Sequence, residues 1–592
     1  MGWNILSDAL SVEEILRKVE SDLNTLRWGH QRGQLFIEAG KLFEEKGDLQ
    51  KVKEMSWENQ LFCLMYLGSS QQKRSLKRFA PLVEYTNGTV FPDVESFSEE
   101  QIDYYKRRAD ETRNPIHKAR YSDIVWELQK DHTFARKAID AYLQCVPSFY
   151  DNDWQLEMAD SLGRAAQLAL FLNDKNEVNK VKKELFRWIT ILADNVKYRF
   201  CLELIDAILE MKKFVDHEEL KTTVEIASLG TRFYRKMKDG YHLQRSFLEK
   251  LIELMLVLKD REKALEYRKQ MAESFVEEGD WKLENYPSGN LVAAFFYQEA
   301  AKSYADLGDA EKVNELKKRI KIHTREAIET EFKEIKTTVT FPSEPIKDYI
   351  KKLTSITLRE ALTKIVNEAF LIPSLGRIKL EVEEQKKKSP LSFIIPQVSI
   401  RDDNPVLKSQ TEEELFDEHI VQRVAMDYKI KSGIFGDIMT ELRNEKNLDH
   451  ISLLNFLSSS KVYEKDSLDM IGTGLERYFS EDFPSALHLL IPQLERTLRN
   501  MIERLGVATT VLRGNVIEEK TLGRILKEPK LEEFLGEDIS CYLRTFLVDK
   551  RGDNLRNDIA HGLVTKERCT RHMANTLLFI FLLLTRFGLK KK

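Results

Sequence analysis

The sequence predicts an all-α protein. Leu, Glu and Lys are abundant, whereas 25 Gly and 14 Pro occur among 592 residues. Runs that alternate apolar and polar residues, which mark half-buried strands, are rare, and long segments instead show amphipathic helical periodicity. A chain of this length exceeds what one hydrophobic core can organise, so we expect two to four domains.

Residues 1–335 read as successive amphipathic helices. The stretches AGKLFEEKGDLQKV (Ala39–Val52) and AAKSYADLGDAEKV (Ala300–Val313) share a helix, a Gly-Asp turn and a second helix that opens with a Lys-Val step. Small residues before such a turn let two helices approach closely, and the turn reverses the chain. Related turns are predicted at Asn173-Asp174 and Lys259-Asp260.

These helical pairs resemble tetratricopeptide-type hairpins. Their spacing departs from the steady repeat of about 34 residues that such proteins show, so we predict an irregular α-helical solenoid for residues 1–335. Solenoids usually present a surface to a protein partner. A plain multi-helix scaffold is the alternative interpretation.

Residues 336–411 differ in composition from what precedes them. Six of the 14 prolines fall between Phe341 and Pro405, and charged runs flank a short apolar piece. Because proline blocks helix continuation, this stretch is predicted to be a linker that contains one small hairpin. Helices resume near Glu412, so residues 412–480 are expected to be a helical connector. The prolines are Pro342, Pro345, Pro373, Pro390, Pro396 and Pro405.

Residues 481–592 form the predicted C-terminal domain. From Ser485 to Lys592 there are 19 Lys and Arg against 13 Asp and Glu, a net charge of +6 on a chain whose total is −4. A basic region favours a polyanionic partner, although a solvated surface explains the same count. The unbroken apolar run Leu577–Leu584 is much shorter than the roughly 20 residues of a membrane span, so we expect a buried helix and no membrane association.

Several classes of protein are disfavoured by missing motifs. The five cysteines are scattered singly, which argues against a zinc knuckle or a disulfide framework. The sequence contains no P-loop, no HExxH and no paired-Asp metal motif. Because residues 1–20 lack a basic start followed by an apolar run, no secretory signal is expected. We therefore expect a cytoplasmic protein without a metal or another cofactor.

The segment LRNDIAHGL, residues 555–563, gathers three polar side chains suited to catalysis. A turn before Leu555 and the glycine at 562 predict a short helix between them. On such a helix Asn557 and His561 are i and i+4 and share a face, and the long Arg556 side chain can swing towards a common phosphate.

This segment and its surroundings resemble the HEPN superfamily, small all-α domains whose catalytic members carry Arg, four to six residues, then His. Here the pattern is Arg556-Asn557-x-x-x-His561, preceded by ALHLLIPQLERTLRNMIERLG (Ala486–Gly506) and TLGRIL (Thr521–Leu526) and followed by an apolar helix. The resemblance covers about the last 110 residues. More loosely, HKARYSDIVWE (His117–Glu127) and LLIPQLERTLR resemble an uncharacterised bacterial family that ends in such a module.

The three residues suit metal-independent cleavage of RNA. An imidazole can take a proton from the ribose 2′-OH or give one to the leaving oxygen. The guanidinium of Arg556 matches the oxygens of a phosphorane, and Asn557 is expected to position His561 or to bind phosphate. RNA is the expected partner because this route needs a 2′-OH, whereas DNA cleavage would require activated water and normally metals.

The HEPN resemblance further implies a homodimer whose two motifs face each other across a cleft. Leu577–Leu584 is expected to lie in that interface or in the core of one chain. By resemblance, the function is that of an endoribonuclease acting as a toxin or an antiphage-defence effector. The alternative is a non-catalytic scaffold in which the HEPN-like module mediates dimerisation or binds a nucleotide.

Two residues of the first helix of this module are supporting candidates. Glu495 and Arg499 form an i,i+4 pair, and polar residues on this helix approach the cleft in HEPN proteins, whereas the alternative is an ordinary exposed ion pair. The Arg–His spacing also occurs between Arg235 and His242 and between Arg443 and His450, and is one residue short between Arg113 and His117. Those three pairs lack the HEPN-like context and are interpreted as surface or helix-end residues.

Overall fold

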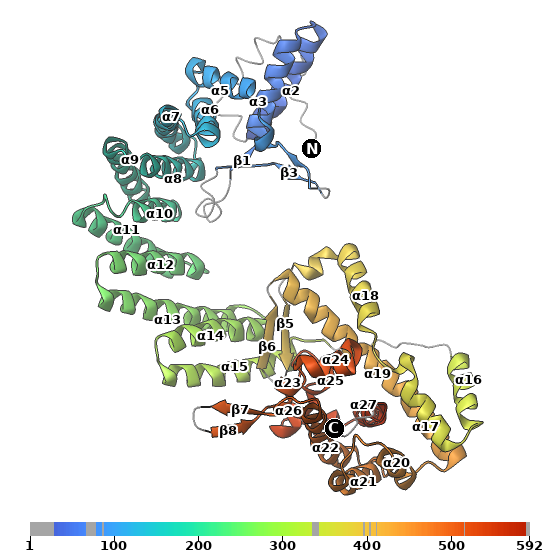
Figure 1. Ribbon diagram of the computed structural model, residues 1–592. Coiled ribbons are helices and arrows are strands. Elements are labelled where there is room, and N and C mark those ends of the chain that lie inside the picture. The colour runs from blue at the N-terminus through green and yellow to red at the C-terminus, as the bar shows by residue number, and fades with distance from the viewer. Residues whose placement is uncertain are drawn as a thin grey trace. The chain divides into compact units, whose positions relative to one another are not determined.

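A computed structural model of the chain describes residue 20 and residues 29–66, 78–85, 88–333, 343–394, 397–401, 404–409, 411–513 and 516–587. Helices dominate these residues, and the strands are short and arranged as antiparallel pairs (Figure 1). The predicted all-α class is confirmed.

The chain divides into two compact units, Met1–Arg319 and Ile320–Lys592, each with its own hydrophobic core. The division falls within one helix, α15, somewhat before the boundary expected at residue 335.

The elements of the first unit, including the helix that crosses the division, are α2 (Gly29–Glu45), α3 (Leu49–Cys63), β1 (Met65–Tyr66), β2 (Phe79–Ala80), β3 (Val83–Glu84), β4 (Val90–Phe91), η1 (Val94–Ser96), α5 (Glu99–Glu111), α6 (Pro115–Gln129), α7 (His132–Asp151), α8 (Gln155–Leu172), α9 (Lys175–Asp194), η2 (Tyr198–Phe200), α10 (Cys201–Glu210), α11 (His217–Arg235), α12 (Tyr241–Val257), α13 (Arg261–Asn285), α14 (Gly289–Asp306) and α15 (Ala310–Thr330).

Most helices of the first unit pack against their neighbours in the sequence. Contacts join α2 with α3, α5 with α6, and each of α6 to α9 with the next, and the same holds from α10 to α14. In Figure 1, α13, α14 and α15 lie side by side. This arrangement is that of a helical solenoid.

The four predicted turns share one local geometry. The residue before each aspartate has a left-handed backbone, with φ of +75° at Gly47 and Gly308, +51° at Asn173 and +62° at Lys259. The aspartate that follows then accepts a hydrogen bond from a backbone N–H in the first turn of the next helix, as Asp48 does from Lys51 at 3.1 Å. A left-handed C-terminal residue followed by an N-cap ends one helix and starts another, so these predictions are confirmed.

The elements of the second unit are α16 (Ser343–Thr354), α17 (Leu358–Asn367), η3 (Ala369–Leu371), α18 (Leu375–Lys388), η4 (Pro390–Phe393), β5 (Gln397–Arg401), β6 (Asn404–Ser409), α19 (Glu412–Lys446), α20 (His450–Ser458), α21 (Lys465–Phe479), α22 (Phe483–Arg504), β7 (Thr510–Arg513), β8 (Val516–Glu519), α23 (Leu522–Ile525), α24 (Pro529–Leu535), α25 (Glu537–Leu547), α26 (Leu555–Ala560), η5 (Lys566–Arg568) and α27 (Arg571–Leu584).

The predicted linker is wrong for residues 343–388, which form α16, α17 and α18. Leu362, Ile365 and Ile378 are fully buried in the core of the second unit. Pro345 does not block a helix here because it lies in the first turn of α16. Backbone N–H groups in the first turn have no partner within the helix, so a proline there removes no helical hydrogen bond. A hairpin does lie in this stretch, with β5 paired antiparallel to β6. Pro342 and Pro396 lie outside the described residues.

The expected connector, residues 412–480, is also part of the core of this unit. Its helix α19 begins with a capping box in which Thr411 and Glu414 exchange side-chain-to-backbone hydrogen bonds. Along its length α19 contacts α16, α18, α25 and α27. The second unit is therefore one helical assembly around α19, α22 and α27.

The apolar run Leu577–Leu584 lies on α27, and these residues are between 0% and 3% exposed. They are covered by α19 and α22 of the same chain. The core interpretation is thus correct, and the interpretation as a dimer interface is wrong. Among the helices that the structure describes, none has the length and apolar character needed to cross a bilayer.

Candidate active site

The Arg556–His561 segment forms the short helix α26, as predicted. The helix follows Asn554, whose backbone is left-handed with φ of +50°, and the chain turns again at Gly562 with φ of +68°. Leu555 is fully buried and anchors the helix. The Asn554 side chain makes no capping hydrogen bond to this helix and is used elsewhere.

Arg556 is held by a carboxylate on α22. Its Nε donates to Glu495 Oε2 at 2.7 Å and its Nη2 donates to Glu495 Oε1 at 3.2 Å. The two side chains are 22% and 15% exposed, so the pair lies at the edge of solvent. A two-point contact between the planar guanidinium and the carboxylate fixes the direction of Arg556.

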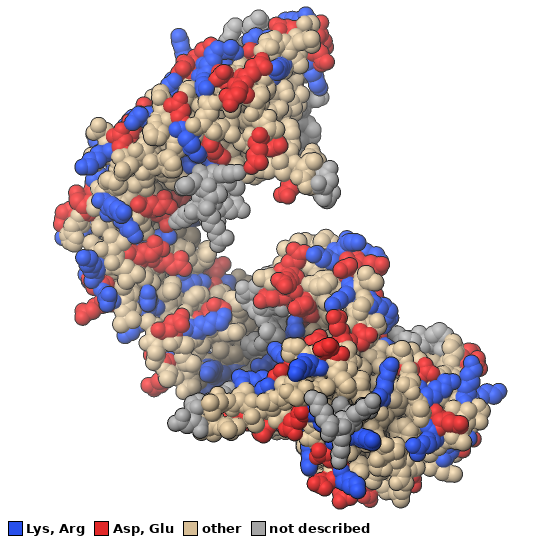
Figure 2. All heavy atoms as spheres, in the orientation of Figure 1, with Lys and Arg blue, Asp and Glu red and all other residues tan. Residues whose placement is uncertain are grey.

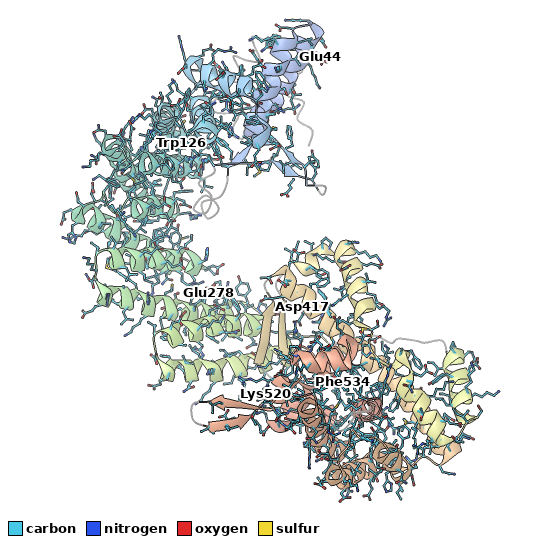
Figure 3. The ribbon with its side chains drawn as sticks, viewed as in Figure 1. Glu44, Trp126, Glu278, Asp417, Lys520 and Phe534 are labelled. Carbon is cyan, nitrogen blue, oxygen red and sulfur yellow. The ribbon has the colours of Figure 1, made fainter. Side chains whose placement is uncertain are left out.

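Arg499 reaches the same carboxylate from one turn further along α22. Its Nη2 lies 3.2 Å from Glu495 Oε1, as the i,i+4 spacing predicted. Its Nη1 also donates to Glu519 at 2.6 Å, and its Nη2 donates to the carbonyl of Lys520, the residue after β8 that Figure 3 labels. Glu495 therefore lies between two guanidinium groups and connects α22 with α26, and Arg499 connects α22 with the end of the β7–β8 hairpin.

Asn557 does not hold His561, which was the first of the two roles expected for it. Its amide Nδ2 donates to Asn554 Oδ1 at 2.7 Å and, at 3.5 Å, to the carbonyl of Val548. Its Oδ1 accepts a hydrogen bond from Arg556 Nη1 at 3.2 Å. Asn557 thus links Arg556 to the base of α26 and leaves no polar atom directed at the imidazole.

His561 is the exposed member of the candidate group. It ends α26, where its backbone N–H donates to the carbonyl of Asn557 at 3.0 Å. Within the described part of the chain, its imidazole has no hydrogen-bond or ion-pair partner, and the side chain is exposed. The structure thus joins Arg556, Asn557, Glu495 and Arg499 through side-chain hydrogen bonds and connects His561 to them through the backbone.

A second polar network beneath α26 was missed from the sequence. Asn554 donates to Asp558 Oδ1 at 2.7 Å, and Arg568 pairs with Asp558 Oδ2 at 2.8 Å, with Asp558 2% exposed. Asp553, just before the helix, accepts a hydrogen bond from Tyr428 at 2.6 Å. The i,i+4 spacing of Asn554 and Asp558 was the available signal. These bonds fix α26 against the rest of the unit.

The other Arg–His spacings have structural roles. Arg235 pairs with Glu277, and Arg443 donates to the carbonyl of Phe479. His117 lies in the first turn of α6, as a helix-end residue, but it is fully buried rather than on the surface.

The charge of the second unit is mixed on the face that Figure 2 draws, where Lys and Arg are interspersed with Asp and Glu. The excess of basic residues near the C-terminus is therefore not gathered into one uniform patch on that face. Among the described residues, no three His, Cys, Asp or Glu side chains cluster closely enough to hold a metal ion.

Comparison with known protein families gives a match in the first unit. Residues 40–181 match the family model of a domain of unknown function, DUF7380. The matched region lies in the first unit and includes α3 and α5 to α8, so it contains none of the candidate site residues. No curated protein matches the chain.

Proposed function

We propose that the second unit is a metal-independent endoribonuclease of the HEPN type. The observation that carries the proposal is the arrangement on α26, where a guanidinium oriented by Glu495 and an exposed imidazole occupy one short helix. The helix is fixed by buried polar contacts beneath it, so both side chains are presented from a rigid element.

The proposed reaction uses the ribose 2′-OH as nucleophile. His561 takes the 2′ proton, or as imidazolium gives a proton to the leaving 5′ oxygen. The 2′ oxygen bonds to phosphorus and the bond from phosphorus to the 5′ oxygen breaks, leaving a 2′,3′-cyclic phosphate and a 5′-hydroxyl. Arg556 would stabilise the charge on the phosphorane oxygens.

Arg556 retains hydrogen-bonding capacity for this role. A guanidinium has five N–H groups, and within the described residues three of them are used, two by Glu495 and one by Asn557. The remaining two suit a phosphate oxygen. Glu495 and Arg499 are then positioning residues rather than catalytic ones.

A homodimer through the C-terminal domain would bring two such helices together, with one His561 acting as base and the other as acid. Leu577–Leu584 cannot form that interface, because it is buried. The β7–β8 hairpin offers exposed apolar side chains instead, with Leu512 and Ile517 each 71% exposed, and its Glu519 is bonded to Arg499. An exposed apolar hairpin beside the candidate site suits contact with a second copy of the chain.

The solenoid would bind a protein partner that senses a trigger or restrains cleavage. A groove of about 970 Å³ runs across α8, α10 and α12. Apolar side chains that include Phe171 and Leu256, each 48% exposed, line it together with charged side chains that include Asp206 and Glu253. Such a groove suits an amphipathic segment of a partner. A cytoplasmic toxin or antiphage-defence effector is the role that the HEPN resemblance implies.

A non-catalytic scaffold is the second candidate, and one observation favours it. Asn557 is committed to Asn554 and Arg556, so no side chain orients His561. Catalytic imidazoles normally have a partner that sets their orientation. In this alternative the module mediates dimerisation or binds a nucleotide without cutting it.

The experiment compares wild type, His561→Ala and His488→Ala on total RNA in excess EDTA. His488 is a matched control, because it is an exposed histidine of the same unit whose Nδ1 contacts the Pro484 carbonyl of its own helix. Cleavage by wild type and His488→Ala but not by His561→Ala, with equal oligomeric state by gel filtration, is the expected result. Equal cleavage by all three proteins would exclude this site, and cleavage by none would favour the scaffold.

A further inference from the structure

The first unit contains a cavity of about 360 Å³ that belongs to neither the candidate active site nor the solenoid groove. Apart from Arg32, its lining residues fall within the matched region, residues 40–181, and α3, α6, α7 and α8 form most of its walls. Figure 3 labels Trp126 on α6. The volume falls in the range of pockets for small organic ligands and far exceeds the space that one water needs.

The walls of the cavity are largely aromatic and apolar. Phe62, Tyr142 and Phe149 line its buried part, and the partly exposed Met65 and Leu82, at 52% and 39%, lie where it reaches the surface. Apolar walls with a few convergent polar groups are typical of ligand sites, and the partly exposed residues mark an entrance.

A buried arginine supplies the main polar group. Arg120 is 5% exposed and lines the cavity, and its Nε donates to the Leu61 carbonyl at 2.9 Å while an Nη donates to the Leu64 carbonyl. Its guanidinium lies 4.8 Å from the centre of the Tyr66 ring and 5.4 Å from that of Phe62. Within the described residues no carboxylate is at ion-pair distance from Arg120. Carbonyls and rings orient the cation without neutralising it, whereas buried charges are normally paired.

Besides Arg120, the lining holds a second arginine, Arg32, and two carboxylates, Glu157 and Asp160. Within the described residues neither carboxylate is at ion-pair distance from Arg120. Arg32 Nη1 lies 3.0 Å from His117 Nε2. Burial and the positive charges of Arg32, Arg108 and Arg120 hold the pKa of His117 well below its usual range, so that its imidazole is neutral. Asp160, a carboxylate of the lining, is paired with Arg78. The Arg120 side of the cavity therefore has positive charge in an apolar setting.

We propose that this cavity binds a small organic anion that carries a flat ring, with its phosphate or carboxylate on Arg120 and its ring among Phe62, Tyr66 and Tyr142. A guanidinium binds either anion through paired N–H groups, and the rings accept a planar body by stacking. A mononucleotide and an aromatic carboxylate share this chemistry. The inference concerns the first unit and does not depend on the proposed ribonuclease site.

Isothermal titration calorimetry on the full-length chain tests the proposal with two probes, AMP and anthranilate. Arg120→Gln removes the cation, and Ala119→Met fills the cavity from α6 while it leaves every charge in place. Arg136→Gln is the matched control, because Arg136 is a half-exposed arginine on α7 that pairs with Asp174. Circular dichroism and melting temperature establish that each variant is folded.

We expect at least one of the two probes to bind at one equivalent per chain, with the same affinity for wild type and for the Arg136→Gln control. Binding should weaken by about tenfold or more in Arg120→Gln and Ala119→Met, which is a loss of about 1.4 kcal/mol. Binding of AMP alone would identify a phosphate ligand, and binding of anthranilate alone a carboxylate. If neither probe binds at about 100 μM, which is about 100 times a Kd of about 1 μM, the proposal is overturned. Unchanged binding in a folded Ala119→Met protein would do so too, even if Arg120→Gln does not fold.

Discussion

Removing the carboxylate of Asp123 should destabilise the first unit by about 3–5 kcal/mol, the typical cost of leaving one partner of a buried ion pair uncompensated. Asp123 on α6 is fully buried and receives Arg164 Nε at 3.0 Å and Nη2 at 2.8 Å from α8. The hydroxyl of Tyr142 on α7 donates to the same carboxylate at 2.7 Å. One side chain thus connects three consecutive helices, and Asp123→Ala would leave the charge of Arg164, which is 4% exposed, without a partner.

The acid dependence of this contact has a definite sign. Burial alone would raise the pKa of Asp123, but the charge and hydrogen bonds of Arg164 outweigh burial, so the pKa lies below its usual value. A carboxylate with a lowered pKa stabilises the fold above the pKa of the unfolded chain, about 3.9, and loses that contribution as the pH falls through the folded value. The pair should therefore be fully stabilising at neutral pH.

Urea unfolding at pH 7, followed by circular dichroism, measures the effect on the transition of the first unit. Asp140→Ala is the control, because Asp140 and Lys180 form a half-exposed pair that should contribute no more than about 1 kcal/mol. Arg164→Met combined with Asp123→Ala should cost less than the sum of the two single changes, since the double variant leaves no unpaired charge. A loss below about 1 kcal/mol for Asp123→Ala, or strict additivity of the two changes, would show that the buried pair of Asp123 and Arg164 does not stabilise the first unit in this way.

Two further predictions concern the same unit. His117→Gln should make the free energy of unfolding of this unit less dependent on pH. The imidazole of His117 stays neutral in the folded protein but binds a proton below about pH 6.5 in the unfolded chain. Wild type should therefore lose up to about 1.4 kcal/mol of unfolding free energy per pH unit as the pH falls towards 5. Urea unfolding at pH 7, 6 and 5 checks this, and equal slopes for both proteins would contradict it. Gly279→Ala should destabilise by about 1–3 kcal/mol, because the new Cβ would lie 2.5 Å from the Tyr297 ring, whose hydroxyl is held by Asp280 at 2.6 Å. In thermal unfolding, Gly163→Ala is its control, with open space around the new Cβ and an expected gain of about 0.4–1 kcal/mol; equal effects of the two alanines would argue against the packing explanation.

The features that were predictable from the sequence are those fixed by local chemistry. The turns at Gly47 and Gly308 combine a left-handed residue with an aspartate that caps the next helix, and all the atoms involved lie within a few residues. The limits of α26 were predictable for the same reason, because Gly562 reverses the chain directly after His561.

Features that depend on tertiary packing were not predictable. The composition of residues 343–388 suggested a linker. The apolar faces of α16 and α18 instead pack against α19, and α17 packs against α27, which only the fold reveals. Arg556 and Glu495 lie 61 positions apart in the sequence. The sequence identified each of them as a candidate site residue, but it could not show that their side chains form a pair. The expectation that Asn557 positions His561 was wrong because the Asn557 amide donates to Asn554 instead.

The proposed cleavage of RNA by His561 and Arg556 through the 2′-OH leaves products with a characteristic chemistry, which can be measured. A labelled RNA should be incubated with wild type in EDTA, its cleavage site mapped, and the same RNA prepared with a single 2′-deoxy nucleotide at that site. We expect 2′,3′-cyclic phosphate ends on the normal RNA and no cut at the substituted position. Cleavage at the deoxy position, or products with 3′-hydroxyl ends, would contradict it.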